Sequence, residues 1–303
     1  MRFDVTILGS SSATPIYNRN PSSQLLNINE RHFLIDCGEG TQVQLIRNNI
    51  KAQRIDHILI SHLHGDHYLG LIGLLSSLHL NGRVKPLYLY GPPELMEILD
   101  IQFKYSQTQL RYPLVFHPTQ VNHPEKIFEN SDVIIETFVL DHRIPCTGFK
   151  FIQKKRSRKI IKEVFDKLKI PIDLIPELKK GAGFTDKKGR VYSADELTTA
   201  PPEPKSYAYC SDTICSWTYL ENIRGVDTLY HEATFMNDML SRAIETFHTT
   251  SLQAGEIAVK AGVKQLLLGH FSARYRELEP LLEECKTVFA NSKLAIEGQT
   301  FDI

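Results

Sequence analysis

The stretch Ser61-His62-Leu63-His64-Gly65-Asp66-His67 places three imidazoles and one carboxylate within six residues, His62 to His67. A strand-like apolar run, residues 55–60, leads into this stretch, and an apolar, helix-like run, residues 68–80, follows it. The stretch is therefore predicted to be a loop between a strand and a helix, a position that often carries binding and catalytic side chains.

The spacing of the four polar side chains predicts two metal-binding groups. His62 and His64 lie two positions apart in an extended entry, so their side chains point the same way and can bind one ion. Asp66 and His67 lie beyond the turn and suit a second ion. Imidazole nitrogen and carboxylate oxygen are ligands that zinc accepts well. The alternative is a polar surface loop whose histidines bind nothing.

These residues form a His-x-His-x-Asp-His motif that resembles the signature of the metallo-β-lactamase superfamily. The resemblance implies an α/β fold, an αβ/βα four-layer sandwich that binds two zinc ions at one edge of its sheets. It also implies ligands far along the chain, and His142, Asp212 and His270 each follow a strand-like run. Each has an ordinary explanation when taken alone, since an Asp before a Thr is often a helix cap. Their joint agreement with one superfamily pattern favours the metal site.

The resemblance also implies how the ligands divide between the two ions. One zinc takes His62, His64, His142 and Asp212, and the other takes Asp66, His67, His270 and Asp212. Asp212 is therefore expected to bridge the ions, and water or hydroxide between them to be the nucleophile. Asp66 is expected to be a general base as well as a ligand. Asp36, at the end of a strand-like run, is expected to hydrogen-bond a zinc-ligating histidine.

Further stretches resemble one branch of the superfamily, the ribonuclease Z family. They are residues 9–15, 19–23, 34–42, 231–234, 248–250 and 269–275, so the resemblance covers most of the chain. It implies a zinc-dependent endoribonuclease that removes the 3′ trailer from precursor tRNA by metal-hydroxide attack and leaves a 3′-hydroxyl on the tRNA. It also implies a homodimer in which a protruding arm of each subunit serves its partner's active site.

Three residues in these stretches have predicted roles besides metal binding. His248 is expected to donate a proton to the leaving oxygen, and Glu232 to fix the tautomer and charge of His248. The alternative for His248 is an ordinary residue before a helix. Arg274 is expected to bind a substrate phosphate, with a surface salt bridge as the alternative.

Residues 154–204 differ from the rest of the chain in charge. They contain 13 basic and 8 acidic residues, a net charge of +5, whereas the whole chain has 35 of each. We predict an amphipathic helix over residues 159–169 and little apolar surface in this segment. The segment is expected to be a protruding arm that binds the tRNA backbone, because Lys and Arg contacts to phosphate are independent of sequence. The alternative is a solvated insertion. The family's arms often have a Gly-Pro-rich tip, but residues 170–176 contain no glycine. The detailed contacts of this arm with tRNA are therefore not predicted.

The length of 303 residues suits one domain, residues 1–303, with 154–204 as its insertion. No apolar run is long enough to cross a membrane, and no signal-peptide pattern follows the first strand. The five cysteines are scattered, which is typical of a reducing cytoplasm.

Two other classes of function remain open. One is another phosphodiesterase or hydrolase of the same fold, against which the basic segment and the motifs at Glu232 and His248 argue. The other is a non-catalytic metal- or RNA-binding protein, which would have no need of a general base at Asp66.

Overall fold

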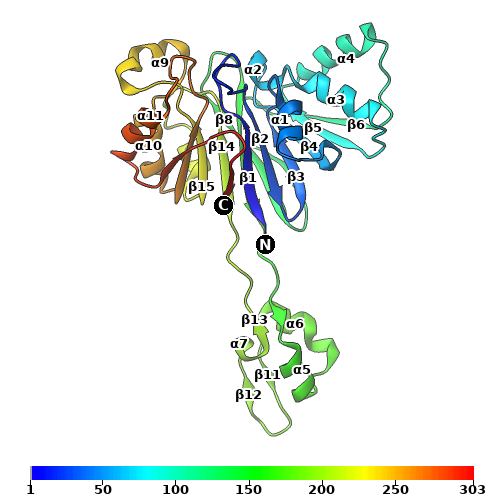
Figure 1. Ribbon diagram of the computed structural model, residues 1–303. Helices are drawn as coiled ribbons and strands as arrows, with labels where there is room; N and C mark the ends of the chain where they lie inside the picture. Colours follow the sequence, from blue (N-terminus) through cyan, green and yellow to red (C-terminus); the bar gives the residue numbers. More distant parts are fainter. Residues whose placement is uncertain (1) are drawn as a thin grey trace. The chain divides into compact units, whose positions relative to one another are not determined.

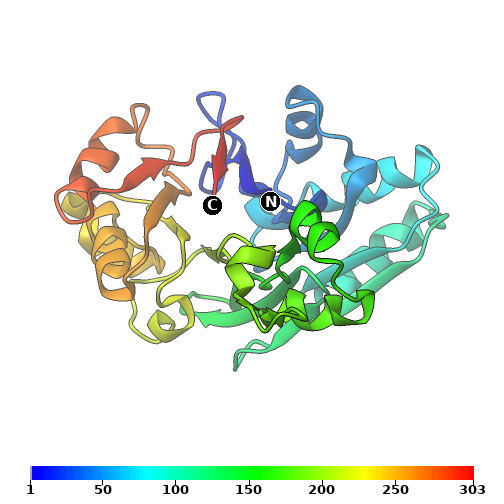
Figure 2. The ribbon, with the colours of Figure 1, turned by 90° about the horizontal axis from the view of Figure 1, so that it is seen from below.

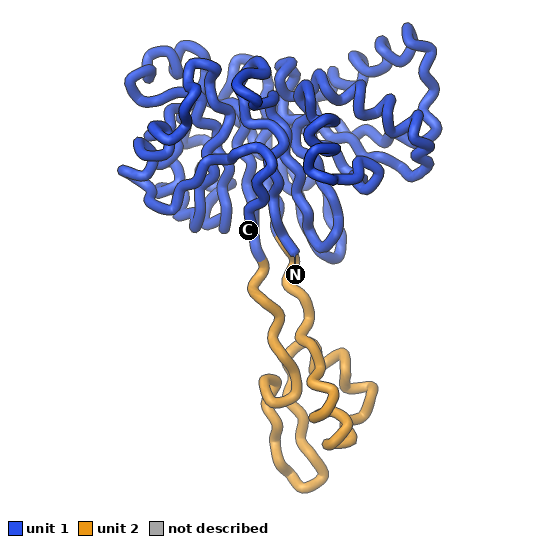
Figure 3. Tube along the Cα trace, in the orientation of Figure 1, with its two compact units in different colours: residues 1–152, 205–303 blue, residues 153–204 orange. Residues whose placement is uncertain are grey.

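The computed structural model describes residues 2–303, which form two compact units (Figure 3). The larger unit contains the residues up to 152 together with 205–303, and the smaller unit contains residues 153–204. The larger unit is built on two seven-stranded sheets, and the smaller unit has two two-stranded sheets.

The first large sheet mixes antiparallel and parallel pairing. Its strands, in spatial order, are β18 (Thr300–Asp302), β1 (Phe3–Gly9), β2 (Ser23–Ile28), β3 (Arg31–Ile35), β4 (Ile55–Leu59), β5 (Leu87–Gly91) and β6 (Leu114–Pro118). Strands β18 to β3 pair antiparallel, and β3 to β6 pair parallel. Because both faces of this sheet are covered, β1 and β2 are buried along their whole length.

The second large sheet carries a parallel block that matters for the site. Its strands, in spatial order, are β17 (Ser292–Leu294), β16 (Gln265–Gly269), β15 (Thr228–Glu232), β14 (Ser206–Cys210), β9 (Cys146–Gln153), β8 (Val133–Leu140) and β7 (Lys126–Glu129). Strands β14 to β17 are parallel, and β9 runs antiparallel to β14. The carboxyl ends of the parallel strands therefore meet at one edge of the sheet.

Helices cover the outer face of each sheet (Figures 1 and 2). Those beside the first sheet are α1 (Thr41–Arg47), α2 (Gly65–Tyr68), α3 (Leu71–Leu80) and α4 (Leu95–Tyr105), with the 3-10 turn η1 (Ala52–Arg54). Those beside the second sheet are α8 (Leu220–Ile223), α9 (Leu240–Thr246), α10 (Ser251–Ala261) and α11 (Glu279–Lys286), with the 3-10 turn η3 (Asn237–Met239).

Three apolar cores separate the four layers. Between the sheets, Ile7 and Leu26 share a core with Phe149 and Tyr209. Outside the first sheet, leucines of α3 and α4 pack with β-strand residues such as Ile58. Outside the second sheet, residues of α10 and α11 pack against β16. This arrangement confirms the predicted αβ/βα sandwich.

The smaller unit has its own small core. Its elements are β10 (Lys159–Ile160), α5 (Lys162–Leu168), η2 (Ile172–Leu174), α6 (Ile175–Lys180), β11 (Phe184–Thr185), β12 (Val191–Tyr192), α7 (Ala194–Leu197) and β13 (Thr198–Thr199). Ile170, Leu178 and Leu197 are buried and are joined by partly buried neighbours such as Phe165. The expectation of little apolar surface in this segment was therefore wrong.

The helix predicted over residues 159–169 is shorter in the structure. Lys159 and Ile160 pair with Thr199 and Thr198 in β10 and β13, so this part of the chain is extended. The helix begins at Lys162 and ends at Leu168. Strand pairing, which residue periodicity does not report, decides where the helix begins.

Within residues 2–303, no helix is both long enough and apolar enough to span a membrane.

Candidate metal centre and active site

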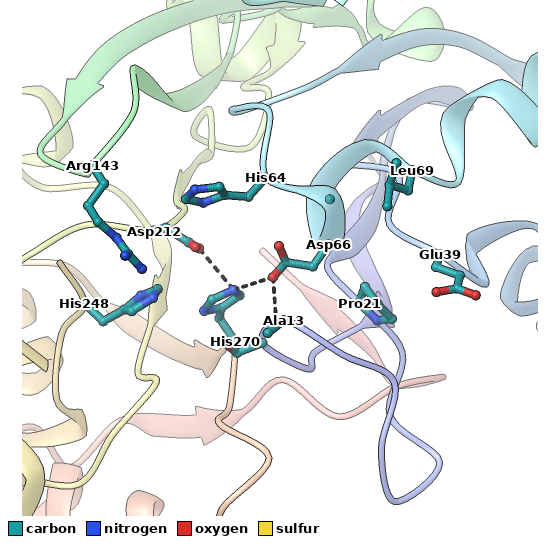
Figure 4. A pocket seen from close by; sticks show the side chains of 12 residues that line it. Ala13, Pro21, Glu39, His64, Asp66, Leu69, Arg143, Asp212, His248 and His270 are labelled. Atoms are coloured by element: carbon teal, nitrogen blue, oxygen red, sulfur yellow. Dashed lines mark hydrogen bonds and ion pairs between the residues drawn. The ribbon is translucent and has the colours of Figure 1, made fainter. Parts of the chain in front are cut away.

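The predicted ligands come together because most of them follow the carboxyl end of a strand, while Asp66 and His67 lie on α2 just beyond β4. The stretch with His62 and His64 follows β4, His142 follows β8, and Asp212 and His270 follow β14 and β16. The dihedral angle φ of His270 is 59°, a left-handed conformation that histidine tolerates better than most residues. Figure 4 shows the side chains of His64, Asp212 and His270 around one pocket.

The first donor group consists of His62, His64, His142 and Asp212, whose nearest donor atoms all lie within 4.8 Å of one another. His64 Nδ1 lies 3.1 Å from His62 Nε2 and 3.2 Å from His142 Nε2. Asp212 Oδ2 lies 3.6 Å from His62 Nε2 and 3.8 Å from His142 Nε2. Three imidazoles and one carboxylate oxygen thus converge on one point.

The second donor group consists of Asp66, His67, Asp212 and His270, again within 4.8 Å of one another. Asp212 Oδ1 lies 3.4 Å from His67 Nε2 and 3.2 Å from His270 Nε2. Asp66 Oδ2 lies 3.5 Å from His67 Nε2 and 3.3 Å from His270 Nε2. The two carboxylate oxygens of Asp212 therefore serve different groups, which is the geometry of a bridging carboxylate.

The imidazoles are oriented by hydrogen bonds on their far side. His67 Nδ1 donates to Asp36 Oδ2 at 2.7 Å, His142 Nδ1 donates to the Phe247 carbonyl at 2.9 Å, and His270 Nδ1 lies 2.9 Å from Thr234 Oγ1. These contacts fix the tautomer and leave the Nε2 atoms facing the donor groups. The expected contact between Asp36 and a ligand-type histidine is confirmed.

Asp36 is itself held by a buried network. Its side chain accepts hydrogen bonds from the Ser61 backbone N–H at 2.7 Å, the Ser61 hydroxyl at 2.9 Å and the Tyr209 hydroxyl at 2.7 Å. Since Ser61 precedes His62, the network also fixes where the loop leaves β4. Tyr209 lies on β14, so the network joins the two sheets beneath the site.

The site fits a divalent cation on its own chemistry. His67 Nε2 and Asp212 Oδ1 are buried and have no hydrogen-bond partner within the described chain. Burial lowers the pKa of His67, but the carboxylates of Asp212, Asp66 and Asp36 outweigh it and raise that pKa above its ordinary value. Burial lowers the pKa of His62, which favours the neutral, ligand form of its imidazole. The His/Asp cluster is thus a candidate metal centre.

A carboxylate–imidazole pair borders the metal centre. His248 Nδ1 donates to Glu232 Oε1 at 2.8 Å, and Glu232 is fully buried. Burial lowers the pKa of His248, but the Glu232 charge outweighs it and raises the pKa to about 9. The His248 ring centroid lies 5.4 Å from that of His270 and 5.3 Å from that of His142. The pair predicted from the sequence is therefore formed at the edge of both donor groups.

Glu232 also does something that the sequence did not indicate. It accepts hydrogen bonds from the Thr213 backbone N–H at 3.0 Å and from the Thr234 hydroxyl at 2.6 Å. Thr213 follows Asp212, and Thr234 contacts His270. The carboxylate thus helps hold two loops of the metal centre as well as His248.

The pocket over the metal centre has a volume of about 330 Å³ (Figure 4). Its lining includes Ser12, Ala13, Glu39, Leu69 and Arg143 beside the donor groups and His248. Arg274 is not among the lining residues, and its guanidinium lies 5.9 Å from the centroid of the Phe235 ring. The expected phosphate contact of Arg274 stays a prediction.

One contact had no signal in the sequence. The backbone N–H of Ala13 donates to Asp66 Oδ2 at 2.8 Å, so the loop after β1 supports a donor of the second group. A backbone donor carries no residue-type signature, and only the tertiary structure reveals it. Thr234 and Tyr209 did lie in predicted motifs or strands, but no pattern assigned them a contact.

Comparison with known proteins first gives the class. A family model described as anti-Pycsar protein Apyc1 matches residues 3–156. A metallo-β-lactamase fold protein of Bacillus subtilis, YhfI, has a TM-score of 0.70 at 20% identity over 100% of both chains. The chain belongs to the family that the anti-Pycsar protein Apyc1 model describes. Its fold is that of the metallo-β-lactamases.

Longer matches then give the particular family. A ribonuclease Z of Bacteroides fragilis is 42% identical over 98% of both chains, and one of Cytophaga hutchinsonii is 44% identical over 99% of this chain and 96% of its own. Human tRNase Z, short form, has a TM-score of 0.72 at 25% identity over 98% of both chains. The chain belongs to the ribonuclease Z family, and it is a nuclease, hence a hydrolase.

Proposed function

We propose that this enzyme is a zinc-dependent endoribonuclease that removes the 3′ trailer from precursor tRNA. The observation that carries the proposal is a pair of donor groups sharing Asp212, bordered by the hydrogen-bonded pair of Glu232 and His248. The ribonuclease Z relatives and the human tRNase Z support the choice of substrate.

We infer that two zinc ions occupy the two donor groups. His62, His64, His142 and Asp212 would hold one ion, and Asp66, His67, His270 and Asp212 the other. When bound, divalent ions lower the pKa of water and offset the negative charge of a phosphodiester. Buried, neutral imidazoles and ionised carboxylates are the forms that such ions require.

The protein's own residues would move two protons. Asp66 would accept the proton of the attacking water, and His248 would donate one to the leaving 3′ oxygen of the tRNA. Glu232 holds His248 Nδ1, so the donated proton would come from Nε2. The bond between phosphorus and the 3′ oxygen breaks as the bond to the water oxygen forms, which leaves a 3′-hydroxyl on the tRNA.

Substrate binding would involve residues outside this centre. We propose that the basic segment 154–204 binds the tRNA backbone through Lys and Arg contacts to phosphate, and that Arg274 adds a contact nearer the reaction. We further propose a homodimer that works in the cytoplasm.

A substrate comparison tests the proposal. The protein is incubated with a tRNA precursor carrying a 3′ trailer, with mature tRNA, and with a small phosphodiester such as bis(p-nitrophenyl) phosphate. We expect efficient cleavage of the precursor at one position near the end of the acceptor stem. Cleavage of the small diester with no action on the precursor would instead favour another phosphodiesterase of the same fold.

A further inference from the structure

Arg143 is the one permanently charged cation among the described residues that line the pocket over the metal centre. It follows His142 in the loop between β8 and β9. In Figure 4, Arg143 and His248 lie on one side of the pocket and point into it, while Glu39 lies on the other. A phosphodiester is an anion, so a cation at this position can contact it directly.

The guanidinium of Arg143 is exposed and has no hydrogen-bond or ion-pair partner among residues 2–303. Two other exposed arginines of the larger unit are paired, by contrast: Arg224 with Glu221 and Arg242 with Glu245. The five N–H donors of Arg143 are therefore free for a ligand, in the fork geometry that suits phosphate oxygens.

The backbone that carries Arg143 is held on both sides. The Asp141 carbonyl accepts a hydrogen bond from the Ile214 N–H at 2.9 Å, and the Thr147 N–H donates to the Ser61 carbonyl at 3.0 Å. His142, directly before Arg143, is fixed to the Phe247 carbonyl. These hydrogen bonds hold the loop against the strand ends that carry the donor groups. They therefore fix the backbone position of Arg143 beside the metal centre.

We propose that Arg143 binds the non-bridging oxygens of the scissile phosphodiester, on the same side as His248. This rests on the proposed function for the identity of the diester, but the phosphate chemistry of the site can be measured separately. Arg143 would orient the phosphate so that the leaving oxygen faces the proton donor. Its role is distinct from that predicted for Arg274, which lies outside the pocket lining.

The test compares Arg143→Ala, Arg143→Lys and Arg274→Ala with Arg224→Ala as the matched control, an exposed arginine paired with Glu221 away from the pocket. Calorimetric binding of inorganic phosphate to the metal-loaded protein is measured beside kcat/KM on precursor tRNA and bis(p-nitrophenyl) phosphate. Metal content is determined for each variant.

We expect Arg143→Ala to weaken phosphate binding and to lower kcat/KM on both substrates by roughly 10- to 100-fold, as for loss of a charge-assisted hydrogen bond. Arg143→Lys should recover part of the loss, since it restores the charge without the fork. Arg224→Ala should behave as wild type. If Arg143→Ala also loses metal, the inference is judged on Arg143→Lys, which should still bind phosphate more weakly than wild type.

Unchanged phosphate affinity and unchanged kcat/KM in the Arg143 variants would overturn the inference. A fall on precursor tRNA alone, with phosphate and small-diester kinetics intact, would also overturn it, because Arg143 would then bind RNA away from the scissile group. A wild-type protein that binds phosphate through Arg143 but leaves precursor tRNA intact would refute the proposed function and keep the inference.

Discussion

Asp212 is the residue on which the two donor groups depend. Its Oδ1 faces His67 and His270, and its Oδ2 faces His62 and His142. We predict that Asp212→Ala loses more metal than any single histidine variant, because each histidine belongs to one group only. Metal analysis of the purified variants checks this, with His142→Ala as the comparison. Two ions per chain in Asp212→Ala would rule out a bridging role.

Asp66 is predicted to be needed for chemistry. It belongs to the second donor group and is the proposed acceptor of the proton from water, so Asp66→Ala should abolish precursor cleavage. The apolar cores around it lie on β4 and α3 and should keep the chain folded, as circular dichroism would show. Turnover close to that of the wild type would contradict the assignment.

The coupling of His248 to Glu232 makes a prediction about pH. A general acid must be protonated, so its contribution is lost as the pH rises through its pKa, and Glu232 raises the pKa of His248 to about 9 although burial opposes this. Glu232→Gln removes the charge, so the alkaline limb of the kcat profile should move to lower pH. His248→Ala should lower kcat by roughly 10²–10⁴-fold with both metals retained. An alkaline limb unmoved by Glu232→Gln would show that His248 is not the acid.

Among single residues, the sequence predicted the candidate metal donors better than the contacts that hold these donors in place. The polar residues that follow strands, from His62 to His270, can be recognised in the sequence because such residues rarely end apolar runs by chance. The support from the Ala13 N–H and the second role of Glu232 depend on loops that meet only in the folded chain. A local sequence pattern cannot predict such contacts between distant loops.

Among the elements, apolar runs predicted the strand before the metal donors and the helix after them, but the helix over residues 159–169 only in part. The helix α10 spans 251–261, where a capping box at Thr250 and a glycine at Gly262 mark its ends. The short strands β6, β7, β17 and β18 were not predicted, since three to five residues at a sheet edge carry too little pattern. The helix-like run over 68–80 corresponds mainly to α3, and α2 already begins at Gly65, so part of the stretch predicted to be a loop is helical.

The basic segment, residues 154–204, is the element whose proposed role is most easily separated from the chemistry. Its Lys162, Lys167, Lys179 and Lys187 are exposed and lie far along the chain from every predicted metal donor. We predict that changing all four to Ala weakens precursor tRNA binding and flattens its salt dependence, because fewer counterions are released from the RNA. Binding measured over a range of salt concentrations gives the slope, and cleavage of bis(p-nitrophenyl) phosphate serves as the internal control.

Deleting residues 154–204 and joining the ends with a short linker should have a larger effect of the same kind. The small core of the segment involves its own residues, Ile170, Leu178 and Leu197, so the larger unit keeps its three cores. Loss of small-diester activity in a folded deletion variant would instead make the segment part of the catalytic site. If the salt dependence of tRNA binding were unchanged by the deletion, the segment would be only a solvated insertion.

At the scale of the whole molecule, metal binding should be linked to stability. The centre gathers residues from both sheets, so ions bound there favour the folded chain over the unfolded one. We predict that a chelator lowers the melting temperature by several degrees and that added zinc restores it. A melting temperature indifferent to chelator, in protein shown to be metal-free, would contradict this linkage.

Mapping of the product ends checks the proposed metal-dependent cleavage of precursor tRNA at its 3′ side. Precursor tRNA with a 3′ trailer is incubated with the metal-loaded protein, with the chelated protein, and with the chelated protein after addition of zinc. We expect one cut that leaves a 3′-hydroxyl on the tRNA and a 5′-phosphate on the trailer. This activity should be lost on chelation and regained with zinc. A product with a 3′-phosphate, or cleavage that persists in metal-free protein, would contradict it.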